Sequence, residues 1–129
     1  MSESPRRDAL FHITSADEAN DAARSGTYAP GTFDAEGFIH CSYSHQVRAV
    51  ADRIFGGRSD LVLLEIDPAR LSCDVVDENL EGGTERFPHI YGRLPVSAIV
   101  RVHQFPCDAT GRFELPAVLN GLPPSGRRP

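Results

Sequence analysis

Residues 36–42 read Glu-Gly-Phe-Ile-His-Cys-Ser, a β-prone run that carries two polar side chains. Because side chains alternate along a strand, His40 and Ser42 should share one face, and Ile39 and Cys41 should form the apolar face opposite. A histidine titrates near neutral pH. We therefore take His40 as a candidate catalytic residue and Ser42 as a candidate ligand-binding residue. The alternative is a buried histidine that bonds a backbone carbonyl, with Ser42 at the start of the next helix. Cys41 is expected to be a small buried thiol.

Residues 87–92, Phe-Pro-His-Ile-Tyr-Gly, form a second such stretch. His89 and Tyr91 lie two residues apart, so they share a face if the segment is extended. The flanking proline and glycine indicate a fixed loop conformation, and loops held on a scaffold often carry function. His89 is therefore a candidate ligand-binding residue and Tyr91 a candidate catalytic residue. The alternative is a rigid turn in which Tyr91 is packed and its hydroxyl is bonded.

The pair Asp77-Glu78 precedes a glycine-containing loop. The carboxylate of Glu78 could stabilise a developing cation or act as a general base. The alternative is a solvated strand end.

Composition narrows the classes of chemistry. The five histidines show no His-x-x-x-His spacing, so no metal is expected. All 13 basic residues are arginine, which excludes a Schiff-base lysine. The chain has no Gly-x-Gly-x-x-Gly run, no phosphate-binding loop and no Gly-x-Ser-x-Gly elbow. Three widely spaced cysteines and the lack of an export signal predict a cytoplasmic protein with reduced thiols.

The 129 residues suffice for one domain, which we place at 10–114 between flexible tails at 1–9 and 115–129. The net charge of −5 argues against general nucleic-acid binding, and no apolar run is long enough to cross a membrane. The expected partner is a small-molecule or nucleotide ligand. The sequence does not define the oligomeric state.

Hydrophobic periodicity and turn residues predict the elements that position these candidates. Val47, Val50, Ala51 and Ile54 give a second helix one apolar face. The predicted elements are a strand at 10–13, a helix capped by Thr14 or Ser15 that ends near 24, a loop at 28–36, a strand at 38–42, a helix capped by Ser44 that ends near 55, a strand at 61–66 covered on both faces, a short strand near 74–77, a mobile loop at 79–86, a turn at 93–95 and a strand at 98–105. This order predicts an α+β domain with two helices in its N-terminal half and a mixed or antiparallel sheet.

Three motifs resemble those of an uncharacterised bacterial family, domain of unknown function 952. They are Phe11-His12-Ile13-Thr14, residues 37–42 together with Gln46, and residues 87–92. The resemblance covers about residues 10 to 105. We assign Thr14 and Gln46, which lie in these motifs, as further ligand-binding residues.

That family in turn resembles the ADP-ribosyltransferase fold, and the RNA 2′-phosphotransferases, which use NAD, are the nearest likeness. Their His-Gly-Thr would match His12-Ile13-Thr14, and their His-x-His-x-Ser strand would match residues 38–42. The resemblance implies a split sheet and NAD as a substrate. It also implies that His12 bonds a ribose and that His40 lines the nicotinamide or ribose pocket.

Two hypotheses of function follow. In the first, the chain binds NAD and transfers ADP-ribose to an unknown acceptor, with His40, Glu78 and Tyr91 as catalytic residues. In the second, the chain is a non-catalytic module whose histidine-lined cleft binds a small ligand. Ile13, which stands where the phosphotransferases have glycine, favours the second hypothesis.

Overall fold

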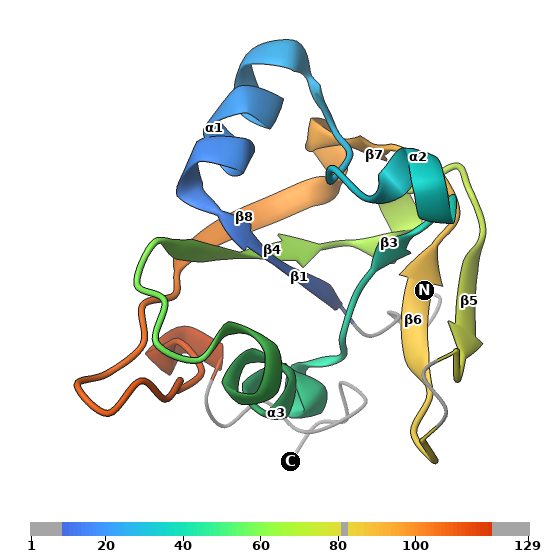
Figure 1. Cartoon of the computed structure of the whole chain (residues 1–129). Helices are drawn as coiled ribbons and strands as arrows, with labels where there is room; N and C mark the ends of the chain where they lie inside the picture. Colours follow the sequence, from blue (N-terminus) through green and yellow to red (C-terminus); the bar gives the residue numbers. More distant parts are fainter. Residues whose placement is uncertain (1–8, 81–82, 120–129) are drawn as a thin grey trace.

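The computed structural model describes residues 9–80 and 83–119 and shows an α+β domain, as the sequence predicts (Figure 1). The strands of the described residues form three antiparallel sheets with the orders β1-β4-β8, β2-β7 and β3-β6-β5. The strands are β1 (Leu10–Ser15), β2 (Thr27–Tyr28), β3 (Ile39–His40), β4 (Leu61–Ile66), β5 (Val75–Glu78), β6 (Phe87–Ile90), β7 (Leu94–Pro95) and β8 (Ile99–Gln104).

Strand β4 lies at the centre of the largest sheet and is covered on both faces, which confirms the prediction for residues 61–66. Val62 and Leu64 join a core cluster that includes Ile39 and Cys41. The alternate residues of β4 join a second cluster under the helix α3 (Ser44–Phe55). The near-continuous apolar run is therefore explained by two buried faces.

Helix α1 (Ala16–Ser25) begins and ends at the residues that the sequence indicates. The hydroxyl of Ser15 accepts a hydrogen bond from the Glu18 backbone N–H at 3.1 Å, and Gly26 closes the last turn in the left-handed conformation. Helix α3 begins one residue earlier than expected. Tyr43, not Ser44, is its N-cap residue, because the Gln46 side-chain oxygen accepts the Tyr43 N–H at 2.9 Å.

The segment predicted as a loop at 28–36 contains two further elements. Tyr28 pairs with Leu94 in the short β2-β7 sheet, and the helix α2 (Phe33–Glu36) follows. The turn predicted at 93–95 is thus the partner strand of that sheet. Gly37 ends α2 with a φ of 81°, which favours glycine, and its N–H donates to the Phe33 carbonyl at 2.7 Å.

The strand predicted at 38–42 is shorter than expected, because β3 holds only Ile39 and His40. Ser42 instead pairs with Phe11 of β1 through two backbone hydrogen bonds of 2.8 Å. The segment that follows β3 therefore connects two sheets. Ile39 and His40 pair with β6, and Ser42 pairs with β1.

The C-terminal boundary of the packed domain lies beyond the predicted one. Leu119 is 4% exposed and Leu115 packs beside it in the second core cluster, although both were assigned to a flexible tail. The remaining tail residues, 120–129, and the N-terminal residues 1–8 lie outside the described residues, as do residues 81–82 of the predicted mobile loop. Within residues 9–80 and 83–119, the helices lack the length and apolarity that crossing a bilayer requires.

Gly92 is required by a close approach between two segments. A Cβ atom at this position would lie 2.8 Å from both Cβ and Sγ of Cys73, which is closer than such atoms pack. The glycine in the third motif therefore has a structural cause, because it lets the chain after β6 pass against the turn before β5.

We predict that Gly92→Ala lowers the free energy of unfolding by about 1–3 kcal/mol, the usual cost of overpacking. Gly31→Ala is the matched control, because a Cβ there meets no atom within 4 Å, and its cost should stay within about 0.5 kcal/mol. Urea denaturation of the three proteins measures both values. If Gly92→Ala and Gly31→Ala have the same free energy of unfolding, the protein relieves the contact with Cys73 without losing stability.

Candidate functional site

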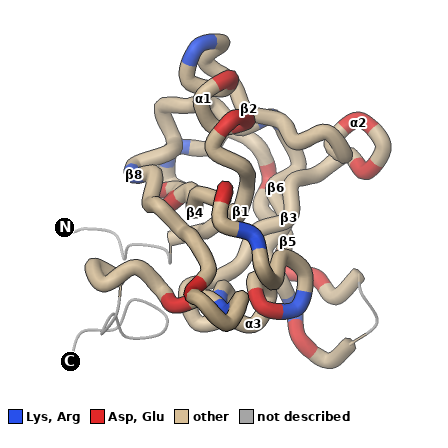
Figure 2. Tube along the Cα trace, turned by 60° about the vertical axis from the view of Figure 1, so that its left-hand side comes forward, with Lys and Arg blue, Asp and Glu red and all other residues tan. Residues whose placement is uncertain are grey.

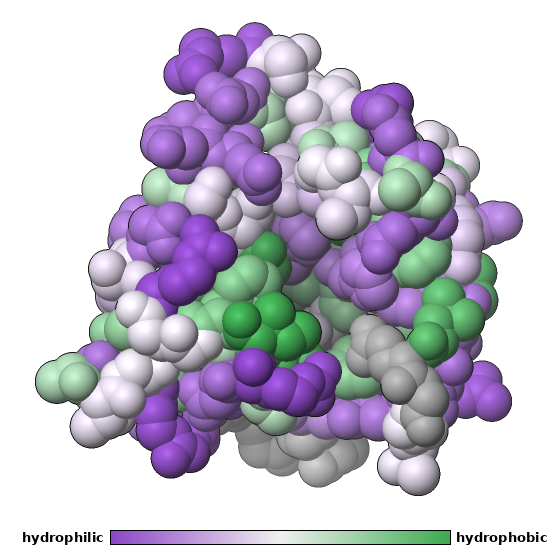
Figure 3. All heavy atoms as spheres, viewed as in Figure 1, coloured by the Kyte–Doolittle hydropathy of each residue, from purple (hydrophilic) through white to green (hydrophobic). Residues whose placement is uncertain are grey.

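Residues of α1, α2 and α3 line a cavity of about 710 Å³, which is within the size range of small-molecule sites. Figure 3 shows this hollow with an apolar centre and hydrophilic residues around it. Its apolar lining residues include Phe11, Ile13, Val50, Ile54, Phe55, Leu61 and Phe87. An apolar floor and a polar rim suit a ligand that has both kinds of group.

A chain of hydrogen bonds forms one wall of the cavity. The Nδ1–H of His12 donates to the His40 carbonyl oxygen at 2.6 Å, and His12 Nε2 lies 2.7 Å from the Tyr28 hydroxyl. The Tyr28 hydroxyl also lies 3.0 Å from Thr14 Oγ1, which donates to Glu18 at 2.6 Å. We call these four side chains the His12–Glu18 chain. Tyr28 has a single hydroxyl proton, so it donates to His12 or to Thr14 at any one time.

Both ring nitrogens of His12 are thus occupied by protein groups. Burial lowers the pKa of His12 to about 4, because the charged ring loses its hydration. His12 is therefore neutral at physiological pH and fixes the backbone before Cys41. In this structure His12 supports the cavity wall, and its nitrogens are not available to a ribose.

His40 occupies the next position on the wall and has a carboxylate partner. Its Nε2 lies 3.2 Å from Glu36 Oε1, and both side chains line the cavity. Each is about two-fifths exposed, at 42% for His40 and 39% for Glu36. The turn at Gly37 returns the chain from α2 to β3 and so places this pair at the rim.

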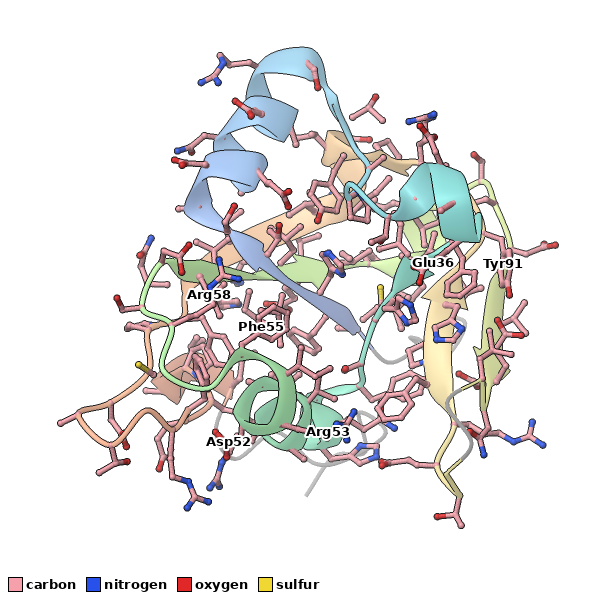
Figure 4. All side chains as sticks on the ribbon, viewed as in Figure 1. Glu36, Asp52, Arg53, Phe55, Arg58 and Tyr91 are labelled. Carbon is pink, nitrogen blue, oxygen red and sulfur yellow. The ribbon has the colours of Figure 1, made fainter. Side chains whose placement is uncertain are left out.

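Helix α3 supplies the opposite side of the cavity. Ile54 is 58% exposed and lines the cavity with Val50, so part of the apolar face predicted for this helix faces the cavity. Two guanidinium groups, those of Arg53 and Arg58, also line this side (Figure 4). Arg58 is held by Asp60, with Nη2 and Oδ2 2.7 Å apart.

A second polar cluster lies beside the cavity but does not line it. Glu78 Oε2 accepts hydrogen bonds from His89 Nδ1–H at 2.9 Å and from the Tyr91 hydroxyl. The Tyr91 bond and then the His89 bond lower the pKa of Glu78. Phe38 stacks on the His89 ring, with centroids 4.5 Å apart, and the His40 ring meets His89 edge-on at 4.9 Å. His40 therefore separates this cluster from the cavity.

The structure brings only part of the predicted site together. His12, Thr14, His40 and Ser42 line the cavity, whereas Glu78, His89 and Tyr91 form the adjacent cluster and Gln46 lies outside both. The amide of Gln46 caps α3 and donates to the Arg86 carbonyl at 2.8 Å, so it joins α3 to the segment before β6. Within residues 9–80 and 83–119 no group of three histidine, cysteine, aspartate or glutamate side chains is placed to hold a metal ion.

Sequence reasoning missed seven polar residues that line the cavity: Ser15, Glu18, Tyr28, Thr32, Glu36, Arg53 and Arg58. Only Glu36 had a local signal, since it is the first residue of the β-prone run at 36–42. Arg53 lies next to Ile54 on α3, and the apolar spacing of this helix is typical of an ordinary helix that packs on a core. The other residues reach the cavity through tertiary contacts that periodicity does not reveal.

We predict that His12 makes the stability of the domain depend on pH. In the unfolded state His12 has an ordinary pKa near 6.5 and binds a proton below that pH. In the folded state it stays neutral until about pH 4. Stability is therefore lost as the pH falls from about 6.5 to about 4. The loss is about 3 kcal/mol, at about 1.4 kcal/mol for each pKa unit.

The measurement compares the free energy of unfolding of the wild type and His12→Gln from pH 7 to pH 4. Glutamine keeps a donor and an acceptor but does not titrate, so the stability advantage of the wild type should shrink as the pH falls. Other carboxylates titrate in both proteins and cancel. A difference that stays constant with pH would contradict a buried neutral His12.

Comparisons with known proteins place the chain in a family. Residues 13–102 match the family described as "Protein of unknown function (DUF952)". The crystal structure of protein CC0527 from Caulobacter crescentus is 34% identical, covers 83% of this chain and 94% of its own, and superposes with a TM-score of 0.74. The solution structure of the same protein is 33% identical, covers 85% and 97%, and has a TM-score of 0.74. No curated protein matches. The chain belongs to the DUF952 family, as its three motifs predict.

Proposed function

We propose that the chain binds a nucleotide in the cavity, with NAD as the ligand, and transfers its ADP-ribose group to an acceptor. The cavity itself carries this proposal, because it combines an apolar floor, a histidine at the rim and two arginines opposite. Arginine suits phosphate, since its planar guanidinium offers five N–H donors. NAD and the split sheet of the ADP-ribosyltransferases come from the resemblance of the motifs.

The transfer is balanced as a substitution at the ribose. The bond between C1′ and the nicotinamide nitrogen breaks, and nicotinamide leaves with the electron pair. An oxygen or nitrogen of the acceptor bonds to C1′ and loses its proton. In this scheme His40 contacts the ribose or the nicotinamide, and the His12–Glu18 chain holds the wall on which His40 sits.

Glu78 and Tyr91 were predicted to be catalytic, and that role stays a prediction. They do not line the cavity, so the proposal assigns contact with the ligand to His40 and the arginines. The Glu78–His89–Tyr91 cluster then acts by holding the rings against which His40 packs.

A non-catalytic binding module is the second candidate, and two observations favour it. Both ring nitrogens of His12 are bonded within the protein, and the bulky side chain of Ile13 lines the cavity where the phosphotransferases have glycine. Close approach of nicotinamide to the backbone is thus restricted. Release of nicotinamide from NAD above a boiled control would exclude this candidate.

We predict that calorimetric titration of the wild type with NAD gives a saturable heat, and that Arg53→Gln weakens binding about tenfold. The estimate follows from a hydrogen bond to a charged group, worth about 1.5–3 kcal/mol. His40→Ala should weaken binding as well, because it removes the rim contact.

The control is Arg101→Gln, which makes the same change of charge on β8, away from the cavity. It should leave the affinity unchanged. Absence of heat with the wild type into the millimolar range would refute NAD as the ligand. Equal loss in both arginine variants would mean that net charge, and not the cavity, sets the affinity.

A further inference from the structure

The charged residues that line the cavity differ in sign between the helices that supply them. Glu18 lies on α1 and Glu36 ends α2, so the side of these two helices contributes carboxylates. The α3 side contributes guanidinium groups, from Arg53 within the helix and Arg58 just after it. In Figure 2 the charged positions of α2 are all acidic, whereas α3 carries both basic and acidic positions, because Asp52 lies beside Arg53. A ligand between the two sides meets opposite charges at its two ends.

The negative pole lies at Glu36 more than at Glu18. Glu18 accepts the Thr14 hydroxyl at 2.6 Å, which holds its carboxylate to the His12–Glu18 chain. The hydrogen bond with Asp60 is the main cause that raises the pKa of Arg58, and the nearby Glu18 carboxylate raises it further, so part of the Glu18 charge is offset. Glu36 pairs with His40, whose ring is uncharged unless it is protonated. Glu36 therefore presents its carboxylate to a ligand at the rim.

The positive pole lies on the α3 side. Arg58 uses Nε and one terminal nitrogen on Asp60, which leaves N–H donors of its five for another acceptor. Figure 4 shows Arg53 on α3 below the cavity and Glu36 above it at the end of α2. Ile54 and Val50, one helical turn apart on α3, are apolar residues that line the same cavity.

We infer that the ligand of this cavity is dipolar. Its cationic end lies at Glu36 and His40, its apolar or planar body lies on Ile54, and its anionic end lies at Arg53 and Arg58. This inference rests on the proposed function and narrows it. Among nicotinamide nucleotides the oxidised form is dipolar, because it carries a positive pyridinium ring and a negative pyrophosphate. The reduced form and ADP-ribose keep only the negative end.

The test compares three probes, NAD⁺, NADH and ADP-ribose, by calorimetric titration of the full chain. The wild type should bind NAD⁺ about fivefold more tightly than NADH or ADP-ribose, the size of effect expected for a half-exposed charge pair. Glu36→Gln should remove this preference by weakening NAD⁺ alone. Arg53→Gln and Arg58→Gln should weaken all three probes and keep the preference.

Asp34→Asn is the matched control for Glu36→Gln, because it removes a carboxylate from the same short helix outside the cavity. It should keep the NAD⁺ preference of the wild type. Far-ultraviolet circular dichroism and the thermal midpoint of each variant verify that the fold is retained.

The remaining outcomes separate this inference from the proposed function. If NAD⁺ and NADH bind equally and Arg53→Gln weakens both, the cavity binds the nucleotide but the dipolar assignment is wrong. If a preference for NAD⁺ survives in Glu36→Gln, the negative pole is wrongly placed. If no probe binds, both the proposed function and this inference are overturned.

Discussion

The cavity depends on the place where β1 meets the segment after β3. Phe11 and Ser42 exchange two backbone hydrogen bonds of 2.8 Å, and His12 bonds the His40 carbonyl at 2.6 Å one residue further along β1. These contacts attach the β3-β6-β5 sheet to the β1-β4-β8 sheet. Because β3 is only two residues long, its direction is set by this attachment more than by its own pairing. The position of His40 at the rim follows from it.

The motif residues therefore divide into those that build the site and those that face a ligand. His12 and Gln46 use their polar atoms within the protein, and Gly92 lets two segments pass. His40 and Ser42 face the cavity. Buried polar groups are costly unless they are paired, so a polar residue in such a motif can be required for the fold alone. Residue type and spacing do not distinguish the two roles.

The sequence predicts the elements that are determined locally. The apolar run of β4 and the Ser15 and Gly26 caps of α1 need only neighbouring residues, and they are where the sequence indicates. It fails where tertiary contacts decide. Tyr28 becomes a strand residue because it pairs with Leu94, and Ile54 faces a cavity although its spacing is that of a core residue. Part of the candidate site was predicted from the sequence. The three motifs indicate which side chains are neighbours, but they do not indicate which of those side chains face a cavity.

A ligand in the hollow lined by α1, α2 and α3 would change the surroundings of the residues there. Amide chemical shifts of the ¹⁵N-labelled protein, recorded while NAD is added, measure this change. We expect the amides of Ser42, Ile54 and Phe55 to shift together and saturate, while those of β8 do not move. Shifts confined to β8, or spread evenly over the surface, would contradict binding in the cavity.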